Sequence, residues 1–120
     1  MTKAGWKKKI KSACVDAGTY RPFFDSVIDT LAEILERRDD ANEVFRKTGG
    51  NVIVMHTNKG GARNAEQNPA LRLANDLNRD ALAYWRDLGL TPAGLRKLNA
   101  DVVKENNTGN LEKLLAKIAE

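Results

Sequence analysis

Residues 68–92 read NPALRLANDLNRDALAYWRDLGLTP, and this stretch decides the fold. Asn68 and Pro69 predict a helix start, because asparagine caps free backbone N–H groups and proline fits the first turn. Gly89 predicts the end of this helix, and Thr91-Pro92 repeats the cap-and-proline signature for a shorter helix. The apolar face of the first helix, at helical spacing, consists of Leu71, Leu73, Ala74, Leu77, Ala81, Tyr84 and Trp85.

Two further helices are predicted upstream of this stretch. A short amphipathic helix ends near Gly18, and a longer one runs from about residue 22 to 47 and stops at Gly49-Gly50. The longer helix would span roughly 39 Å, and Asp39-Asp40 is a candidate break in it. The apolar stripe of the short helix consists of Trp6, Ile10, Ala13, Cys14 and Ala17. That of the longer helix consists of Phe24, Val27, Ile28, Leu31, Ile34, Leu35, Val44 and Phe45.

Residues 51–57, NVIVMHT, are rich in β-branched side chains, and the glycines at 60 and 61 tolerate a tight turn. This pattern predicts a small hairpin or extended loop, with an ordinary helix connection as the alternative. Residues 101–110 are polar and predict a linker, followed by a short amphipathic helix. We therefore expect a mainly α fold with a small β hairpin: a helical domain over 1–100, then a linker and C-terminal helix over 101–120.

The composition favours a folded protein without an active site. Hydrophobic residues make up 42% and charged residues 30%, which is typical of a soluble domain. Apolar runs fall short of the roughly 18 residues that cross a bilayer, and the early lysines lead into no signal core, so a cytoplasmic location is expected. One histidine and one cysteine cannot build a Cys/His metal cluster, and the glycines match no nucleotide-binding loop. We expect no cofactor, no metal and no catalytic residue.

The formal net charge of +4 is concentrated at the N-terminus, where five lysines precede the first acid, Asp16. A second acid-free window lies between Glu43 and Glu66. Such clusters favour contacts with DNA phosphates that read no bases, although a merely solvated face is the alternative. Trp6 could stack on a base, but packing in the core is favoured. The main candidate contacts are Lys7, Lys8, Lys9 and Lys11, followed by Lys47, Lys59 and Arg63.

The segment Asn68-Pro69-Ala70-Leu71, followed by a helix and by Leu88-Gly89-Leu90-Thr91-Pro92, resembles the signature of the P27-type family of phage terminase small subunits. The preceding long helix, Gly-Gly stop and β segment are in the family's order too, so the resemblance covers roughly residues 5–98. Members often continue with a more arginine-rich stretch after Thr-Pro, and here only Arg96 and Lys97 are carried over as candidate DNA contacts.

The resemblance implies a non-catalytic cyclic homo-oligomer that recognises the packaging start on double-stranded viral DNA in the host cytoplasm. It also implies recruitment of the large terminase subunit, which carries the ATPase and nuclease. A ring would bury apolar surface that one small domain cannot cover. The expected subunit interface consists of Phe24, Ile28, Leu31 and Leu35.

The C-terminal helix is expected to dock on the large subunit or on a neighbouring protomer, with docking on its own core as the alternative. Its apolar stripe consists of Leu111, Leu114, Leu115 and Ile118. Two other functions remain open: a small helix-turn-helix regulator that turns at Thr91-Pro92, and a structural adaptor whose lysines serve only solubility.

Overall fold

The computed structural model describes the backbone of residues 1–119 and the side chains of residues 1–101 and 114–118. Its helices are α1 (Lys3–Ala17), the 3-10 turn η1 (Pro22–Phe24), α2 (Asp25–Lys47), α3 (Pro69–Asp87) and α4 (Pro92–Ala119). Between α2 and α3 lie the strands β1 (Ile53–Thr57) and β2 (Arg63–Gln67), which pair as an antiparallel hairpin. The mainly helical class with a small hairpin is confirmed.

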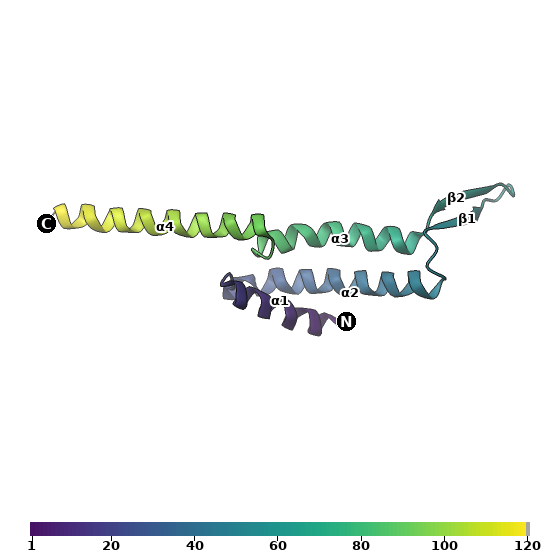
Figure 1. Cartoon of the computed structure of the whole chain (residues 1–120), viewed down its shortest axis with the longest axis horizontal. Coiled ribbons are helices and arrows are strands. Elements are labelled where there is room, and N and C mark those ends of the chain that lie inside the picture. Colours follow the sequence, from purple (N-terminus) through teal and green to yellow (C-terminus); the bar gives the residue numbers. More distant parts are fainter. Residues whose placement is uncertain (120) are drawn as a thin grey trace.

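The body of the molecule is an antiparallel pair of helices, α2 and α3, with α1 packed along the N-terminal part of α2 (Figure 1). Buried alanines on both long helices let them lie close together, because interaxial distance depends on the side chains at the contact. The hairpin and the greater part of α4 project from opposite ends, so the chain extends over 86 × 27 × 21 Å. The core consists of Ile10, Cys14, Ile28, Leu31, Ala32, Leu35, Ala81 and Leu88.

Asn68 fixes the point where the hairpin meets α3. Its side-chain oxygen accepts a hydrogen bond from the Ala70 N–H at 3.0 Å, which is the predicted cap, and Pro69 follows in the first turn. Its side-chain amide donates to the Asn51 carbonyl at 3.0 Å, and its backbone N–H donates to the Val52 carbonyl at 2.7 Å. One largely buried residue therefore starts the helix and closes the base of the hairpin.

The turn between α3 and α4 is tight. Gly89 adopts a positive φ of 73°, and the Thr91 hydroxyl caps α4 by accepting the Gly94 N–H at 3.0 Å. The two helices then follow one another along the long axis (Figure 1). That arrangement lacks the steep crossing of a helix-turn-helix, so the structure does not support such a unit at Thr91-Pro92.

Two expectations about helix breaks were wrong. α2 runs unbroken through Asp39-Asp40, because Asp39 is held by partners on α1 and on α2 itself. Residues 101–110 are helical, not a linker, since α4 is continuous over Pro92–Ala119. Once a helix is started and capped, each added residue gains a backbone hydrogen bond, and the sequence after Pro92 contains no further proline. Among the described helices, none has an apolar stretch long enough to cross a membrane.

Replacing Gly94 with alanine should destabilise the fold by about 1–3 kcal/mol, a usual cost of overpacking. A Cβ at this position would clash with the backbone carbonyl of Arg86, which cannot move without distorting the end of α3. Urea unfolding measures the change. The matched control is Gly60→Ala in the hairpin turn, where the added Cβ would meet Asn58 Oδ1 at an ordinary 3.4 Å. Equal stability of the two variants would contradict the close approach of α4 to α3.

Candidate nucleic-acid interface

The lysines of α1 are not equivalent. Lys7 Nζ and Lys3 Nζ each lie 3.1 Å from one carboxylate oxygen of Asp29 on α2. The hydrogen bonds from Lys7 and then from Lys3 lower the pKa of Asp29, so it stays ionised. Two cations share one anion, and this trio keeps a surplus of one positive charge.

The other lysines of α1 keep their charge near the surface. Lys9 Nζ lies 5.1 Å from the centre of the Trp6 ring, and Lys11 Nζ lies 5.0 Å from the centre of the Tyr20 ring. Both are cation–π distances, which orient the side chain without neutralising it. Lys8 is exposed. Lys7, Lys8 and Lys11 border one shallow groove of about 380 Å³ whose floor includes Ile28.

A polar cluster around Asp39 positions this lysine row by docking α1 on α2. Asp39 Oδ2 accepts a hydrogen bond from Trp6 Nε1 at 2.7 Å and from the Met1 amine at 3.1 Å, and Oδ1 accepts from Arg38 at 3.0 Å. Arg38 also lies over the Trp6 ring at 5.3 Å. The indole of Trp6 is thus committed to the protein interior and not to stacking on a base.

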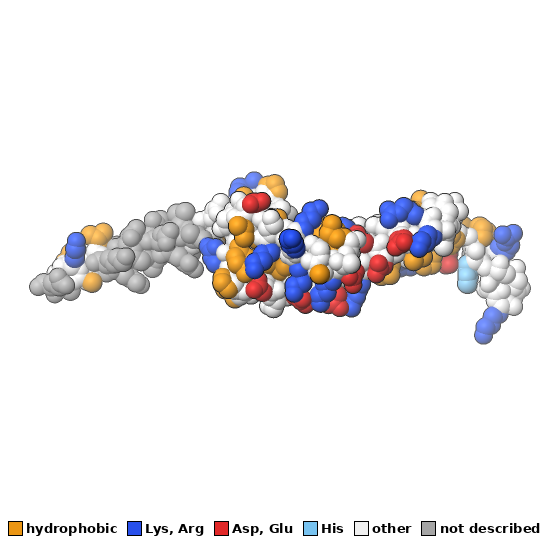
Figure 2. All heavy atoms as spheres, turned by 90° about the horizontal axis from the view of Figure 1, so that it is seen from below, with side chains coloured by type: hydrophobic (Ala, Val, Ile, Leu, Met, Phe, Trp, Pro, Cys, Tyr) orange, Lys and Arg blue, Asp and Glu red, His pale blue; other side chains and the backbone are white. Residues whose placement is uncertain are grey.

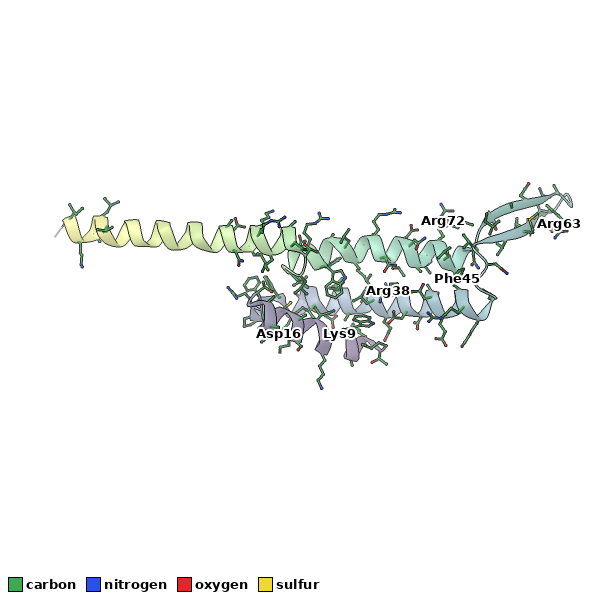
Figure 3. The ribbon with its side chains drawn as sticks, viewed as in Figure 1. Lys9, Asp16, Arg38, Phe45, Arg63 and Arg72 are labelled. Carbon is green, nitrogen blue, oxygen red and sulfur yellow. The ribbon has the colours of Figure 1, made fainter. Side chains whose placement is uncertain are left out.

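A second cationic region lies at the hairpin, far along the molecule from α1, as the labelled Lys9 and Arg63 show in Figure 3. Lys47 forms an ion pair with Glu43 at 2.9 Å one turn earlier in α2, so its charge is offset. Lys59 and Arg63 are exposed on the hairpin and belong to no ion pair among the described side chains. Figure 2 shows lysine and arginine side chains at this end beside the single histidine.

The remaining candidates, Arg96 and Lys97, are exposed on the first turns of α4. The candidate DNA contacts therefore occupy three places and do not converge on one pocket. The sequence reasoning missed arginines at 72, 79 and 86, whose seven-residue spacing places them on one exposed side of α3. Aspartates at 76, 80 and 87 interleave with them, and Arg79 lies 3.8 Å from Asp76, so this side is nearly neutral.

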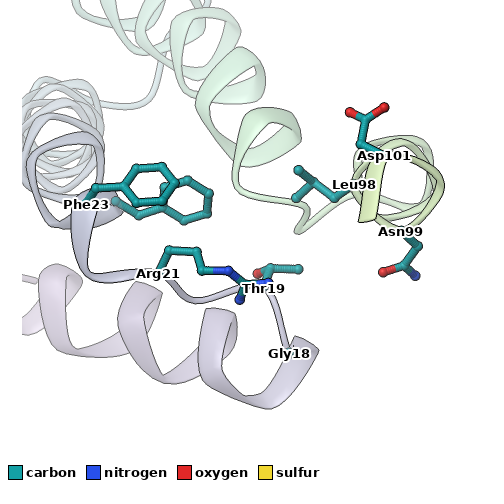
Figure 4. A pocket seen from close by; sticks show the side chains of 8 residues that line it. Gly18, Thr19, Arg21, Phe23, Leu98, Asn99 and Asp101 are labelled. Atoms are coloured by element: carbon teal, nitrogen blue, oxygen red, sulfur yellow. The ribbon is translucent and has the colours of Figure 1, made fainter. Parts of the chain in front are cut away.

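A pocket of about 450 Å³ lies between the turn after α1 and the start of α4. Figure 4 shows Thr19, Arg21 and Phe23 on one wall and Leu98, Asn99 and Asp101 on the other. Among these lining residues no nucleophile is paired with a base. Across the described residues, no group of three or more His, Cys, Asp or Glu side chains is placed to hold a metal ion.

The structure changes the expected subunit interface. Ile28, Leu31 and Leu35 are at most 2% exposed inside one copy of the chain, because α1 and α3 cover α2 from two sides. They are therefore unavailable to a neighbouring copy. Phe24 packs at the edge of the same core and makes an edge-to-face contact with Phe23, the ring centres being 4.7 Å apart.

Other large apolar side chains are exposed in place of that stripe. Phe23 is 74% exposed, and Ile118 near the end of α4 is 77% exposed. Leu111 lies outside the residues whose side chains are described. The further exposed apolar side chains of the body, hairpin and tail include Val44, Val52, Ile53, Met55, Leu73, Leu82, Leu114 and Leu115.

Comparison with known proteins gave one match. A family model described as phage terminase, small subunit, matches residues 2–105. No curated protein and no solved structure matched the chain. The matched range includes α1, α2, the hairpin, α3 and the first part of α4.

Replacing Asp39 with asparagine should destabilise the protein by about 1 kcal/mol at neutral pH, because charge-assisted hydrogen bonds become neutral ones. Partial burial raises the pKa of Asp39, but hydrogen bonds from Trp6, Arg38 and the N-terminal amine lower it more, so the net shift is downward. A lowered folded-state pKa gives stability that is present above the unfolded value and lost as pH falls through the folded value.

The difference between wild type and Asp39→Asn should therefore shrink on acidification below about pH 4. Urea unfolding across the acidic range measures it. Asp40→Asn, which changes an exposed carboxylate beside the cluster, is the control and should follow wild type. A difference that stays constant with pH would show that Asp39 contributes through shape and not through charge.

Proposed function

This chain belongs to the phage terminase small-subunit family, and from that membership we propose that it binds viral DNA at the packaging start and recruits the large terminase subunit. Its role lies in phage DNA packaging. It acts in the host cytoplasm as a cyclic homo-oligomer without catalytic activity of its own. The large subunit supplies ATP hydrolysis and DNA cleavage.

The observation that carries DNA binding is the lysine row on α1. Five lysines at positions 3 to 11 face a single carboxylate ion-pair partner, Asp29, among the described side chains. Such a surplus attracts duplex DNA, because each neutralised phosphate releases condensed counterions. The Asp39 cluster and the two aromatic rings hold the row in place on α2 before DNA arrives, which lowers the cost of ordering the long side chains.

Cyclic assembly is supported by the apolar side chains that one copy leaves uncovered. Phe23 near the start of α2 and Leu82 on α3 are 74% and 48% exposed. A closed ring can bury such residues between neighbours, and it multiplies modest DNA contacts through effective concentration. The subunit interface of this ring then lies on the outer surface of the helical body and not on the buried apolar side chains of α2.

Recruitment of the large subunit is assigned to the end of α4. That segment projects beyond the body (Figure 1), and Leu114, Leu115 and Ile118 are 57%, 58% and 77% exposed. An amphipathic helix with an uncovered stripe fits a groove on another protein. Because the projecting part lies far from its own core, docking back on that core would require α4 to bend or break.

Replacing Lys8, Lys9 and Lys11 with alanine should weaken binding to random-sequence duplex DNA. The slope of log affinity against log salt should fall by about 2–3, at roughly 0.9 for each lost phosphate contact. Fluorescence anisotropy at several salt concentrations measures both quantities. The matched control removes as much charge from the mixed side of α3, by replacing Arg72, Arg79 and Arg86 with alanine. Equal losses in the two variants would mean that net charge, and not the α1 row, drives binding.

Deleting residues 109–120 should leave the melting temperature and DNA affinity of the protein unchanged. It should abolish stimulation of the large subunit's ATPase, because the exposed stripe is removed while the core is untouched. Light scattering on both proteins reports the assembly mass. A smaller mass with intact stimulation would assign the tail to a neighbouring protomer instead. A large loss of thermal stability would place the tail in the core and contradict the projecting helix.

A further inference from the structure

The hairpin is built as a separate arm. It extends from the end of the α2–α3 pair (Figure 1), and its two strands pack chiefly against each other. Of the ten strand residues, all but Val54 are exposed. An isolated two-stranded hairpin in water is only marginally stable. The arm therefore exposes surface that a partner could contact, and binding such a partner would stabilise it.

The strand register sorts the side chains of the arm into two unlike faces. Directly paired residues share a face, and faces alternate along each strand. One face, here called the acid-free face, consists of Ile53, Met55, Thr57, Arg63, Ala65 and Gln67. The opposite face consists of Val54, His56, Asn64 and Glu66, where His56 Nδ1 lies 3.9 Å from Glu66 Oε1. Only the opposite face presents a carboxylate.

The acid-free face carries the side-chain types that read base edges. Arginine pairs with the O6 and N7 atoms of guanine, glutamine pairs with the N6 and N7 atoms of adenine, and apolar groups contact the thymine methyl. Arg63, Gln67 and Ala65 supply one of each along a single strand. A two-stranded ribbon about 5 Å between strands fits a major groove about 12 Å wide.

The tip of the arm is preformed and cationic. Asn58 Oδ1 accepts hydrogen bonds from the N–H groups of Gly60 and Ala62, each at 3.0 Å, and Gly61 adopts a φ of 81°. Lys59 lies in this turn, and no acid occurs in the sequence between Glu43 and Glu66. A positively charged turn that its own hydrogen bonds hold in shape can approach the phosphates that flank a groove.

We propose that the acid-free face of the hairpin enters the major groove of duplex DNA and discriminates base pairs through Arg63 and Gln67. The α1 lysines hold phosphates without reading sequence, and Lys59 holds a phosphate beside the groove. The inference rests on the proposed DNA-binding function and adds to it the element that selects the site. A second copy of this chain is the competing occupant of the same face, and the experiment separates the two.

The test begins with full-length protein and a pool of short random-sequence DNA duplexes, from which the bound fraction is selected repeatedly and sequenced. Affinity for the enriched duplex is then divided by affinity for a scrambled duplex of equal composition. In Arg63→Ala/Gln67→Ala this ratio should fall about tenfold or more, since each bidentate base contact contributes that order of discrimination. The double variant His56→Ala/Asn64→Ala, on the opposite face of the same strands, should keep the wild-type ratio.

Each other outcome has a definite meaning. If the Arg63/Gln67 variant keeps the ratio, or if wild type binds DNA without enriching any sequence, the base-reading proposal is overturned and DNA binding stands. If that variant keeps the ratio but changes the assembly mass in light scattering, the face belongs to a neighbouring copy. If wild type binds no duplex at all, the proposed function fails together with the inference. Far-UV circular dichroism of both double variants confirms that the helical body is intact.

Discussion

The burial of α2 between α1 and α3 is the constraint on which the rest of the structure depends. Leu31 and Leu35 fill the space where the three helices meet, and the apolar stripe of α2 is used up there. The hairpin projects from one end of this three-helix body and α4 from the other, which makes the molecule elongated (Figure 1).

The same packing explains how functions are distributed along the chain. α1 has one face in the core and its lysines outside, and Asp39 ties its N-terminal half to α2 through Trp6. Asp29 of α2 also ties α1 to α2, by forming ion pairs with Lys3 and Lys7. The ion pairs with Asp29 offset part of the charge of the lysine row, and together with the Asp39 cluster they hold the row in place on α2.

The projecting parts differ from the body in what stabilises them. The body is held by apolar burial, whereas the hairpin depends on its own strand pairing, on its turn and on Asn68 at its base. The end of α4 projects beyond the body, and its described apolar side chains Leu114, Leu115 and Ile118 are exposed. Elements of this kind gain most from binding, because a partner supplies the burial that the protomer lacks. This fits the contacts proposed above for the hairpin and for the end of α4.

The sequence by itself determined the local features. The Asn68-Pro69 and Thr91-Pro92 helix starts, the glycine stops and a small hairpin that begins in the β-branched run over 51–57 are confirmed, because caps, turns and strand propensity act over a few residues. The family signature around these starts was visible for the same reason. Only the tertiary structure decided which apolar stripe is consumed in the core, which lysines are paired and which hairpin face is free of acid. Those outcomes depend on contacts between residues far apart in the sequence, such as Trp6 and Asp39. The periodicity of apolar residues identifies an apolar helix face, but it does not say which other helix covers that face.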